Sequence, residues 1–459
     1  MSNINDFIQT MKSAKVSEQT IQIFKYYFQL LIAGEKGKLS KDQITTPKPN
    51  HIIDFNELND LSHQNLKKLA VIKLNGGLGT SMGLSQAKSL LPVKDGYTFL
   101  DIIAKQTLIL RKQYHINLPI MFMNSFYTSQ DTVNFLKKYP ELKNDNLPID
   151  FLQNKFPKVR KDDYKPLSDQ NEENNWNPPG HGDLYNVLSN SSLSASLLDT
   201  MIDNGIEYIF VSNSDNLGAV IDPKILNRLI KDDIDFAMEV CIRTEMDKKG
   251  GHLAATNEGK LILREVAQCP EDEVADFQNI QTYKYFNTNN LWIKLTGLKK
   301  KIQTYGGFLP LNLILNQKNV NDVPVYQLET AMGAAISLFD NSKALCVPRS
   351  RFLPVKKNQD LLLLWSDNYE LDENFVLMQK AGAKDTILDL DDNFFGKIDL
   401  LKNACQKGIP SLFNCDYLKI KGNVRFGSNV KFVGKVNVET DKEMFLENVT
   451  IDNRSYQGN

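Results

Sequence analysis

The sequence predicts an α/β protein built on a mixed, mainly parallel sheet, followed by a small β-helix at the carboxyl end. From about residue 69 to about residue 340, short apolar runs alternate with segments whose apolar residues recur at helical spacing. That alternation indicates parallel strands with helices on both faces of the sheet. Beyond residue 415, apolar residues recur every six positions, which fits the rungs of a β-helix.

Composition and charge bound the class of protein. The chain has 459 residues, of which 42% are hydrophobic, enough for two or three domains with sizeable cores. Its 54 basic and 55 acidic residues leave a formal charge of −1, so no overall field attracts nucleic acid or an anionic membrane. We therefore expect small-molecule substrates, and neither nucleic acid nor membrane as a partner.

The cysteines and the start of the chain predict a cytoplasmic location. The five cysteines are far apart, without a CxxC pair, as expected of reduced thiols. The N-terminal MSNINDFIQTMKS lacks the basic start and unbroken apolar core of a signal peptide. No segment offers the ~18 apolar residues of a membrane span.

The elements follow in chain order. Residues 17–34 predict one amphipathic helix that ends at Gly34, so we assign residues 1–68 to an N-terminal helical segment packed on the core. In the core domain, residues 69–345, strands are predicted within 67–74, 118–125 and 207–216, and helices from Thr98 and within 129–139 and 223–233. Residues 160–183 predict a long loop, and the strands within 235–243 and 260–268 predict an antiparallel addition over the active face.

The carboxyl-terminal repeat consists of two interleaved series six residues apart. They are Leu418, Val424, Val430 and Val436, and Ile420, Phe426, Phe432 and Val438. The period breaks at 439–442 and resumes within 443–451. We assign residues 415–459 to a β-helix and residues 346–414 to a linker region, with a three-stranded meander as the alternative for the repeat.

A glycine-rich run, KLNGGLGTSMG at residues 73–83, directly follows the apolar stretch LAVI. It matches neither G-x-x-x-x-G-K-[ST] nor G-x-G-x-x-G. The general mechanism still applies, because a loop after a strand offers backbone N–H groups to a polyphosphate and Lys88 supplies charge nearby. A tight turn with no ligand is the alternative.

Seven blocks of the sequence, in this order, resemble the eukaryotic-type UTP–glucose-1-phosphate uridylyltransferases. They are KLNGGLGTSMG, KSLLPV, NPPGHGD, FVSNSDNLGA, FNTNNLW, LETAMGAAI and VPRSRFLPVK. The resemblance implies a Rossmann-like nucleotide-diphospho-sugar transferase domain of the GT-A kind over residues 69–345, and a left-handed β-helix at the end. It also implies a reversible, Mg²⁺-dependent reaction of UTP with glucose 1-phosphate that gives UDP-glucose and pyrophosphate.

The resemblance assigns the nucleotide side of the site. In such a reaction the sugar phosphate attacks the α-phosphorus of UTP, which requires positioning and positive charge rather than a covalent nucleophile. Lys88 and Lys356, the latter in the linker region, are implied as catalytic. The implied UTP-binding residues are Leu74, Asn75, Gly76, Gly77, Lys88, Gln153, Gly180 and Lys356.

The sugar phosphate and the metal are assigned in the same way. The implied sugar-phosphate residues are His181, Asn213, Gly251, Glu265, Asn287 and Asn289, and Asp215 is implied as the Mg²⁺ ligand. Asparagine clusters also form turns with self-satisfied side chains, and Asp222 is a helix-cap candidate. Glu329 is left as either a site or a structural residue, and Arg349 and Arg351 as candidate structural partners of acidic residues.

Two alternative functions stay open at this stage. A pyrophosphorylase for another UDP-sugar, or for a broad range of them, shares these features, and a noncatalytic scaffold is the alternative of a different class. Residues 84–87, LSQA, depart from the glycine and proline that many family members carry before the lysine, so the rigidity of that loop is in question. A homo-oligomer formed through the carboxyl-terminal module is also open.

Overall fold

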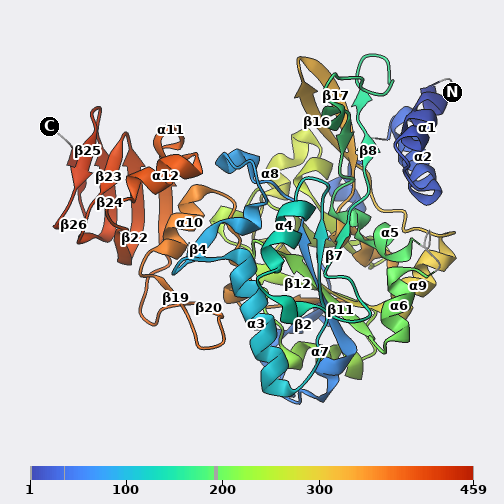
Figure 1. The fold of residues 1–459 in the computed structure, drawn as a ribbon, viewed down its shortest axis with the longest axis horizontal. Coiled ribbons are helices and arrows are strands. Elements are labelled where there is room, and N and C mark those ends of the chain that lie inside the picture. Colours follow the sequence, from blue (N-terminus) through green and yellow to red (C-terminus); the bar gives the residue numbers. More distant parts are fainter. Residues whose placement is uncertain (1–2, 36, 191–194, 458–459) are drawn as a thin grey trace.

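The protein is elongated, with its two ends at opposite extremes of the long axis. The computed structural model describes residues 3–35, 37–190 and 195–457. The N-terminal helices lie at one end, the carboxyl-terminal strands at the other, and the central sheet between them (Figure 1). Within these described ranges, no helix has the length and apolar character that crossing a membrane requires.

The central sheet is mixed and mainly parallel, as predicted. Its main path runs β2-β18-β12-β15-β11-β3-β6-β7. Only β15 runs antiparallel to its neighbours on this path. The strands on the path are β2 (Ile52–Asp54), β18 (Ser342–Cys346), β12 (Phe236–Ile242), β15 (Tyr285–Lys294), β11 (Tyr208–Asn213), β3 (Leu69–Asn75), β6 (Ile120–Asn124) and β7 (Asp150–Leu152).

The two faces of this sheet are buried in two separate hydrophobic cores. Successive strand side chains point to opposite faces, and β3 divides accordingly. Val71 packs in the core that contains Phe99 and Ile103 of α3 (Phe99–Tyr114). Ile72 packs in the core that contains Leu184 of α5 (Leu184–Ser189). This arrangement explains why the strands read as continuous apolar runs.

Helix boundaries in the core domain follow the capping residues that the sequence offers. Thr98 caps α3 and forms a capping box with Asp101. Asp222 caps α7 (Pro223–Lys231) by accepting from the backbone of Lys224, so that prediction is confirmed. The remaining core helices are α4 (Ser129–Leu136), α6 (Leu197–Asp203), α8 (Val274–Phe277) and α9 (Leu295–Thr304).

The N-terminal segment is more than the one helix predicted. The predicted helix is α2 (Glu18–Ile32), capped by Ser17, and α1 (Asn3–Ser13) precedes it. Both contribute to an aromatic-rich core in which the rings of Phe24 and Phe156 meet edge to face, 5.3 Å apart. Two short strands then join the central sheet: β1 (Ile44–Thr45) pairs with β13 (His252–Thr256), and β2 pairs with β18.

The predicted antiparallel addition is wrong for its first strand. Residues 236–242 form β12, which lies inside the central sheet between β15 and β18. The antiparallel unit consists of β13 with β14 (Leu261–Arg264). The β12 strand is buried along nearly its whole length, and such continuous apolar runs do not reveal the direction of the neighbouring strands.

Several small strands complete the periphery of the core domain. The predicted long loop 160–183 is mostly irregular, with two-residue strands at its edges. The strands are β4 (Pro92–Lys94), β5 (Tyr97–Thr98), β8 (Phe156–Pro157), β9 (Val159–Arg160), β10 (Trp176–Asn177), β16 (Ile314–Val320) and β17 (Val323–Glu329). The β16-β17-β9 sheet stands above the central sheet in Figure 1.

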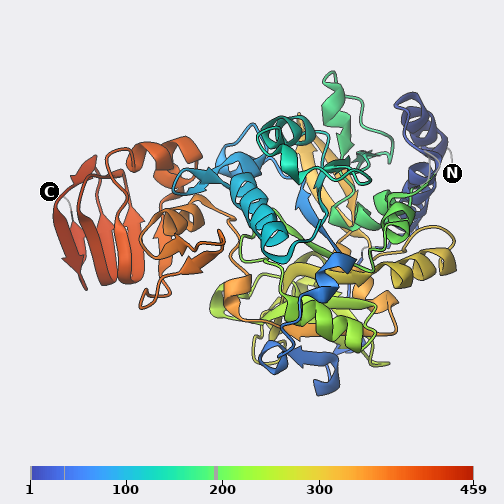
Figure 2. The same cartoon turned by 60° about the horizontal axis from the view of Figure 1, so that its bottom comes forward.

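Residues 358–457 connect to and form the carboxyl-terminal module. The connecting elements are α10 (Asn358–Trp365), β19 (Tyr369–Leu371), β20 (Leu377–Gln379), β21 (Ile387–Leu390), α11 (Asp392–Phe395) and α12 (Ile398–Ala404). The strands that follow are β22 (Ser411–Lys421), β23 (Val424–Phe426), β24 (Val430–Glu439), β25 (Met444–Leu446), β26 (Val449–Asp452) and β27 (Ser455–Gln457). Figure 2 shows these strands as a stacked row.

The pairing in this module is parallel. Leu418 pairs with Val436, Val424 with Met444, and Val430 with Val449. All eight residues of the two six-residue series are buried. An antiparallel meander, the alternative for this segment, is therefore wrong. The strand ladder starts at β21, which pairs with β22, ahead of the predicted boundary at residue 415.

Lys73 on β3 is a buried cation that, among the described residues, hydrogen-bonds no carboxylate. Its ammonium donates to Ser212 Oγ (2.8 Å) and to the carbonyl of Ala219 (3.1 Å), and the residue is 5% exposed. Burial, together with the charge of Arg351, lowers the pKa of Lys73 to about 7, although Glu239 opposes the shift.

This pKa predicts a stability that rises with pH. Between pH ~7 and the ordinary lysine value, the unfolded chain binds a proton that the folded chain has released, so folding becomes more favourable as pH increases. The free energy of unfolding of the wild type, minus that of Lys73→Met, should rise by on the order of 1 kcal/mol per pH unit between pH 7.5 and 9 in urea titrations. The exposed Lys112→Met is the control. A difference that stays constant with pH would contradict the assignment.

Candidate functional site

Most of the predicted site residues line one cleft. The cleft has a volume of about 380 Å³ and lies where β3 and β11 end, the carboxyl edge at which open α/β sheets bind ligands. The predicted residues that line it are Leu74, Asn75, Gly76, Gly77, Lys88, Gln153, Gly180, His181, Asn213 and Asp215. They come from segments far apart in the sequence, so the fold brings together what the motifs suggested.

The glycine-rich loop is fixed at both ends. At the end of β3, the Asn75 amide donates to Asn124 Oδ1 and Thr132 Oγ1, each at 2.8 Å. At the far end, the backbone N–H of Lys88 donates to the carbonyl of Gly77 (3.2 Å). The intervening LSQA residues therefore do not prevent the loop from closing. A Cβ at Gly76 would lie 2.9 Å from Gln153 Oε1, so glycine there allows the two loops to approach closely.

Lys88 connects three segments of the cleft. Its ammonium forms an ion pair with Asp215 Oδ2 at 2.6 Å and also donates to the carbonyl of Val355. The backbone of Val355 in turn donates to the carbonyl of Asp215 (3.2 Å). The glycine loop, the end of β11 and the segment that precedes Lys356 therefore meet at one ammonium group.

Gln153 is held by a buried polar network. Its backbone donates to Asn124, and the next residue, Asn154, donates from its backbone (2.7 Å) and from its amide (2.8 Å) to the Asp183 carboxylate. Thr20 of α2 donates to Asn154 Oδ1 at 2.8 Å. Burial raises the pKa of Asp183, against the effect of the Asn154 hydrogen bonds. The N-terminal helix thus supports the loop that carries Gln153.

His181 has a defined tautomer. The backbone N–H of Met332 donates to His181 Nδ1 at 3.0 Å, so the neutral ring carries its proton on Nε2. Burial lowers the pKa of His181 to about 4, which keeps the ring neutral at physiological pH. The imidazole can therefore donate one hydrogen bond from Nε2 into the cleft without bringing a positive charge.

The remaining sugar-phosphate residues form a second group. Asn287 and Asn289 hydrogen-bond each other through side chains (2.9 Å) and through the Asn289 backbone (2.9 Å). A Cβ at Gly251 would overlap the Glu265 carboxylate. Burial raises the pKa of Glu265, opposed by hydrogen bonding from Asn287 and by the charge of Lys356. These residues do not line the first cleft, and the charge of Lys356 acts on Glu265 within this second group.

The Lys356 side chain does not line the first cleft either. Its Nζ lies 5.7 Å from the centre of the Phe286 ring and 5.9 Å from that of Phe352. The residue borders a separate cavity of about 300 Å³, which shares no lining residue with the first cleft. Its backbone is fixed where α10 begins, because the Asp360 carboxylate accepts from the N–H of Lys356 at 2.7 Å.

Sequence reasoning missed or left open several residues of the site. Pro178, Ser89 and Ser214 also line the cleft. Each stands in one of the seven sequence blocks, close to a residue that was predicted, and that position could have identified it. Glu329, left open, lines the cleft too, and burial raises its pKa. The suggested structural role of the two arginines agrees with the contacts, because Arg349 pairs with Asp247 at 2.7 Å and Arg351 with Glu239 at 2.6 Å.

Comparison with known proteins identifies the family. The family profile described as UTP--glucose-1-phosphate uridylyltransferase (UDPGP) matches residues 21–432. The chain belongs to this family. The enzyme of that name from Solanum tuberosum is 41% identical over 91% of this chain and 87% of its own length, and that from Musa acuminata is 40% identical over 91% and 89%.

Solved structures agree over the whole chain. The UDP-glucose pyrophosphorylase from Leishmania major, solved in open and closed forms, superimposes with a TM-score of 0.92 at 38% identity and covers 100% of both chains. A UDP-glucose phosphorylase from Trypanosoma brucei gives 0.91 at 40% identity, again over 100% of both chains. The predicted family and the predicted nucleotidyltransferase class are therefore confirmed.

The carboxylates near the cleft fit a metal held mainly by its substrate. Across the described part of the chain, no group of three or more His, Cys, Asp and Glu side chains could hold a metal ion. The described residues therefore form no metal site made of protein ligands alone. Mg²⁺, however, commonly binds one or two carboxylates together with substrate phosphates and water. Asp215 is a carboxylate of this kind at the edge of the cleft, although it is engaged by Lys88.

Gly180 gives a direct test of how closely the loops must approach. Its φ of +79° and a Cβ that would overlap the backbone of Thr330 exclude other residues. Gly180→Ala should destabilise the protein by about 1–3 kcal/mol and lower kcat/KM for UTP at least ~10-fold.

The control is Gly205→Ala, with φ +78° but nothing within 4 Å of the added Cβ. It should cost stability without the loss of kcat/KM. Equal kcat/KM for the two variants, measured alongside thermal unfolding, would show that Gly180 has no role in the cleft.

Proposed function

We propose that the chain catalyses the reversible transfer of the uridylyl group from UTP to glucose 1-phosphate, giving UDP-glucose and pyrophosphate. The observation that carries this proposal is the gathering of residues from separate sequence blocks around one cleft at the carboxyl edge of the sheet. Membership of the uridylyltransferase family supports the choice of substrates.

The reaction requires two polyanions to be held together against their repulsion. We assign the backbone from Leu74 to Gly77 to contact UTP, Gln153 to hydrogen-bond the uracil edge, and Gly180 to let the base approach the backbone. The phosphate oxygen of glucose 1-phosphate then attacks the α-phosphorus of UTP, and the bond to the pyrophosphate oxygen breaks in line. Lys88 and Lys356 neutralise charge on the phosphates, which is the main task of such a site.

The sugar phosphate is assigned to two residues of the cleft and to the second group of residues, which lies outside the cleft lining. His181, with its proton on Nε2, donates a hydrogen bond to a phosphate oxygen and, being neutral, does not exchange a proton with it at neutral pH. Asn213, Gly251, Glu265, Asn287 and Asn289 are assigned to the sugar phosphate. Fixed donors and acceptors of this kind discriminate between sugars because a wrong epimer leaves them unpaired.

Magnesium is the proposed metal, and Asp215 the residue that would hold it. When bound, the ion supplies positive charge to phosphate oxygens. Lys88, which pairs with Asp215, carries a charge that can move to the phosphates when substrate is present.

Pyrophosphate release tests the activity, the metal and the class together. UTP with glucose 1-phosphate and Mg²⁺ should release pyrophosphate, and EDTA should abolish the release. A panel of sugar phosphates tests specificity, because a much higher kcat/KM with another sugar would favour a different or broad-range pyrophosphorylase. No release from any mixture would favour the noncatalytic scaffold.

Lys356 carries the sharpest prediction about chemistry. Lys356→Met should fold normally and lose on the order of 100- to 1000-fold in kcat, because an aligned positive charge is missing from the transition state. The neighbouring Lys357→Met is the matched control, since Lys357 is exposed and pairs only weakly with Asp392 at 3.7 Å. Wild-type turnover in Lys356→Met would contradict the role.

The finer features of fold and location are proposals as well. We propose that the parallel carboxyl-terminal strands form a left-handed β-helix, supported by their pairing and six-residue series, and an experimental structure of this chain would reveal its hand. Assembly through this module would appear as a concentration-dependent mass. The five free cysteines support a cytoplasmic location, which cell fractionation checks.

A further inference from the structure

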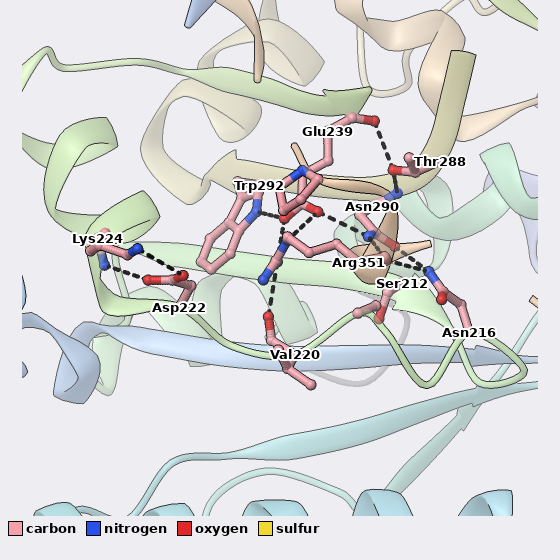
Figure 3. Close-up of polar contacts among 12 residues, drawn as sticks. Ser212, Asn216, Val220, Asp222, Lys224, Glu239, Thr288, Asn290, Trp292 and Arg351 are labelled. Atoms are coloured by element: carbon pink, nitrogen blue, oxygen red, sulfur yellow. Dashed lines mark hydrogen bonds and ion pairs between the residues drawn. The ribbon is translucent and has the colours of Figure 1, made fainter. Parts of the chain in front are cut away.

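A buried ion pair joins the central sheet to the segment that precedes Lys356. Glu239 on β12 is 0% exposed, and Arg351, in the segment before Lys356, is 4% exposed. Arg351 donates to both carboxylate oxygens, at 2.9 and 2.6 Å, and to the carbonyl of Val220 (2.9 Å) (Figure 3). Two parallel hydrogen bonds of this kind fix the guanidinium in direction as well as in position.

The carboxylate is also satisfied from the neighbouring strand. On β15, Trp292 Nε1 donates to one oxygen of Glu239 at 2.9 Å, and the Asn290 amide donates to the other at 3.0 Å. Burying a charge pair is costly unless hydrogen bonds satisfy the remaining lone pairs, and here they do so. The pair therefore holds the segment that contains Arg351 in a fixed position against the central sheet.

Asn216 connects this ion pair to the end of β11, where Asp215 lines the cleft. It follows Asp215, and its amide donates to the carbonyl of Arg351 (3.2 Å) and to Asn290 Oδ1 (3.2 Å). Its own Oδ1 accepts from the backbone of Leu353 at 2.9 Å. An antiparallel bridge between Asn216 and Pro354 continues the contact. Figure 3 shows Asn216 beside both Asn290 and Arg351.

These contacts fix the relative position of two functional groups. The segment from Arg351 to Val355 lies alongside Asp215 and Asn216, and Lys356 is the next residue. We propose that Asn216, supported by the Glu239–Arg351 pair, is a positioning residue that sets Lys356 and Asp215 in register with each other, so that both address the phosphates of one bound nucleotide. This inference rests on the proposed catalytic role of Lys356.

The decisive variant is Asn216→Ala, which removes the side-chain hydrogen bonds of the link and keeps the ion pair. Because small misplacements of a catalytic group cost up to ~100-fold, kcat should fall about 10- to 100-fold while KM for UTP changes less than about 3-fold. Asn227→Ala is the matched control. Asn227, on α7, is also buried. Its amide donates to the backbone carbonyls of Asp60 (3.0 Å) and Ser62 (2.7 Å).

The control separates positioning from stability. Both variants lose buried amide hydrogen bonds, so both should lower the thermal midpoint. Only Asn216→Ala should lower kcat, and Asn216→Gln, which keeps the amide on a longer arm, should recover part of it. Similar kcat losses in both alanine variants would overturn the proposal.

A double-mutant cycle shows whether Asn216 acts through Lys356. In the Lys356→Met background, Asn216→Ala should change kcat less than about 2-fold, because the group that it positions is already gone. Full additivity of the two losses would refute the proposal and leave the role of Lys356 intact. Normal turnover in Lys356→Met alone would instead refute the proposed function of that lysine, whatever Asn216→Ala does.

Discussion

The cleft depends on one ammonium group. Lys88 holds the Asp215 carboxylate and the Val355 carbonyl at the same time, and through them it connects the glycine loop to β11 and to the linker region. A cation is suited to this junction because the same charge that joins the segments also attracts the phosphates of a nucleotide. Under the proposed function, substrate phosphates replace the Asp215 carboxylate as the partner of Lys88, so that binding and rearrangement of the junction are coupled.

Several charged and polar side chains are buried near this junction. Glu239, Arg351, Asn290 and Asn216 lie among apolar strands, each with hydrogen bonds that satisfy it. An apolar core of similar volume would be as stable or more so. Buried polar groups with fixed partners define one geometry, however, and a site that must align several charges benefits from such definition.

Much of this fold could be predicted because its signals are local. Apolar runs and Thr98 as a cap each describe the chain over a few residues, and each led to the right element. The six-residue spacing led to strands, and these pair in parallel. The place of a strand in a sheet is a nonlocal property, which is why β12 was misplaced. The helix α1 was missed because only residues 17–34 of the N-terminal helical segment were assigned a helix. In the site, the motif blocks identified the lining of the cleft. They gave no indication that Lys356 points toward Phe286 and Phe352, or that Thr20 supports the Gln153 loop, because those contacts join distant segments.

Because β2 pairs with β18, the central sheet can be completed only late in the synthesis of the chain. Ile52 leaves the ribosome early, but its partner Ala344 arrives only after the rest of the central sheet, and such long-range pairing is slow to form. The segment that carries Arg351 and Lys356 follows directly after β18. A nascent chain can therefore form its glycine loop before it contains Lys356, the second lysine of the proposed mechanism.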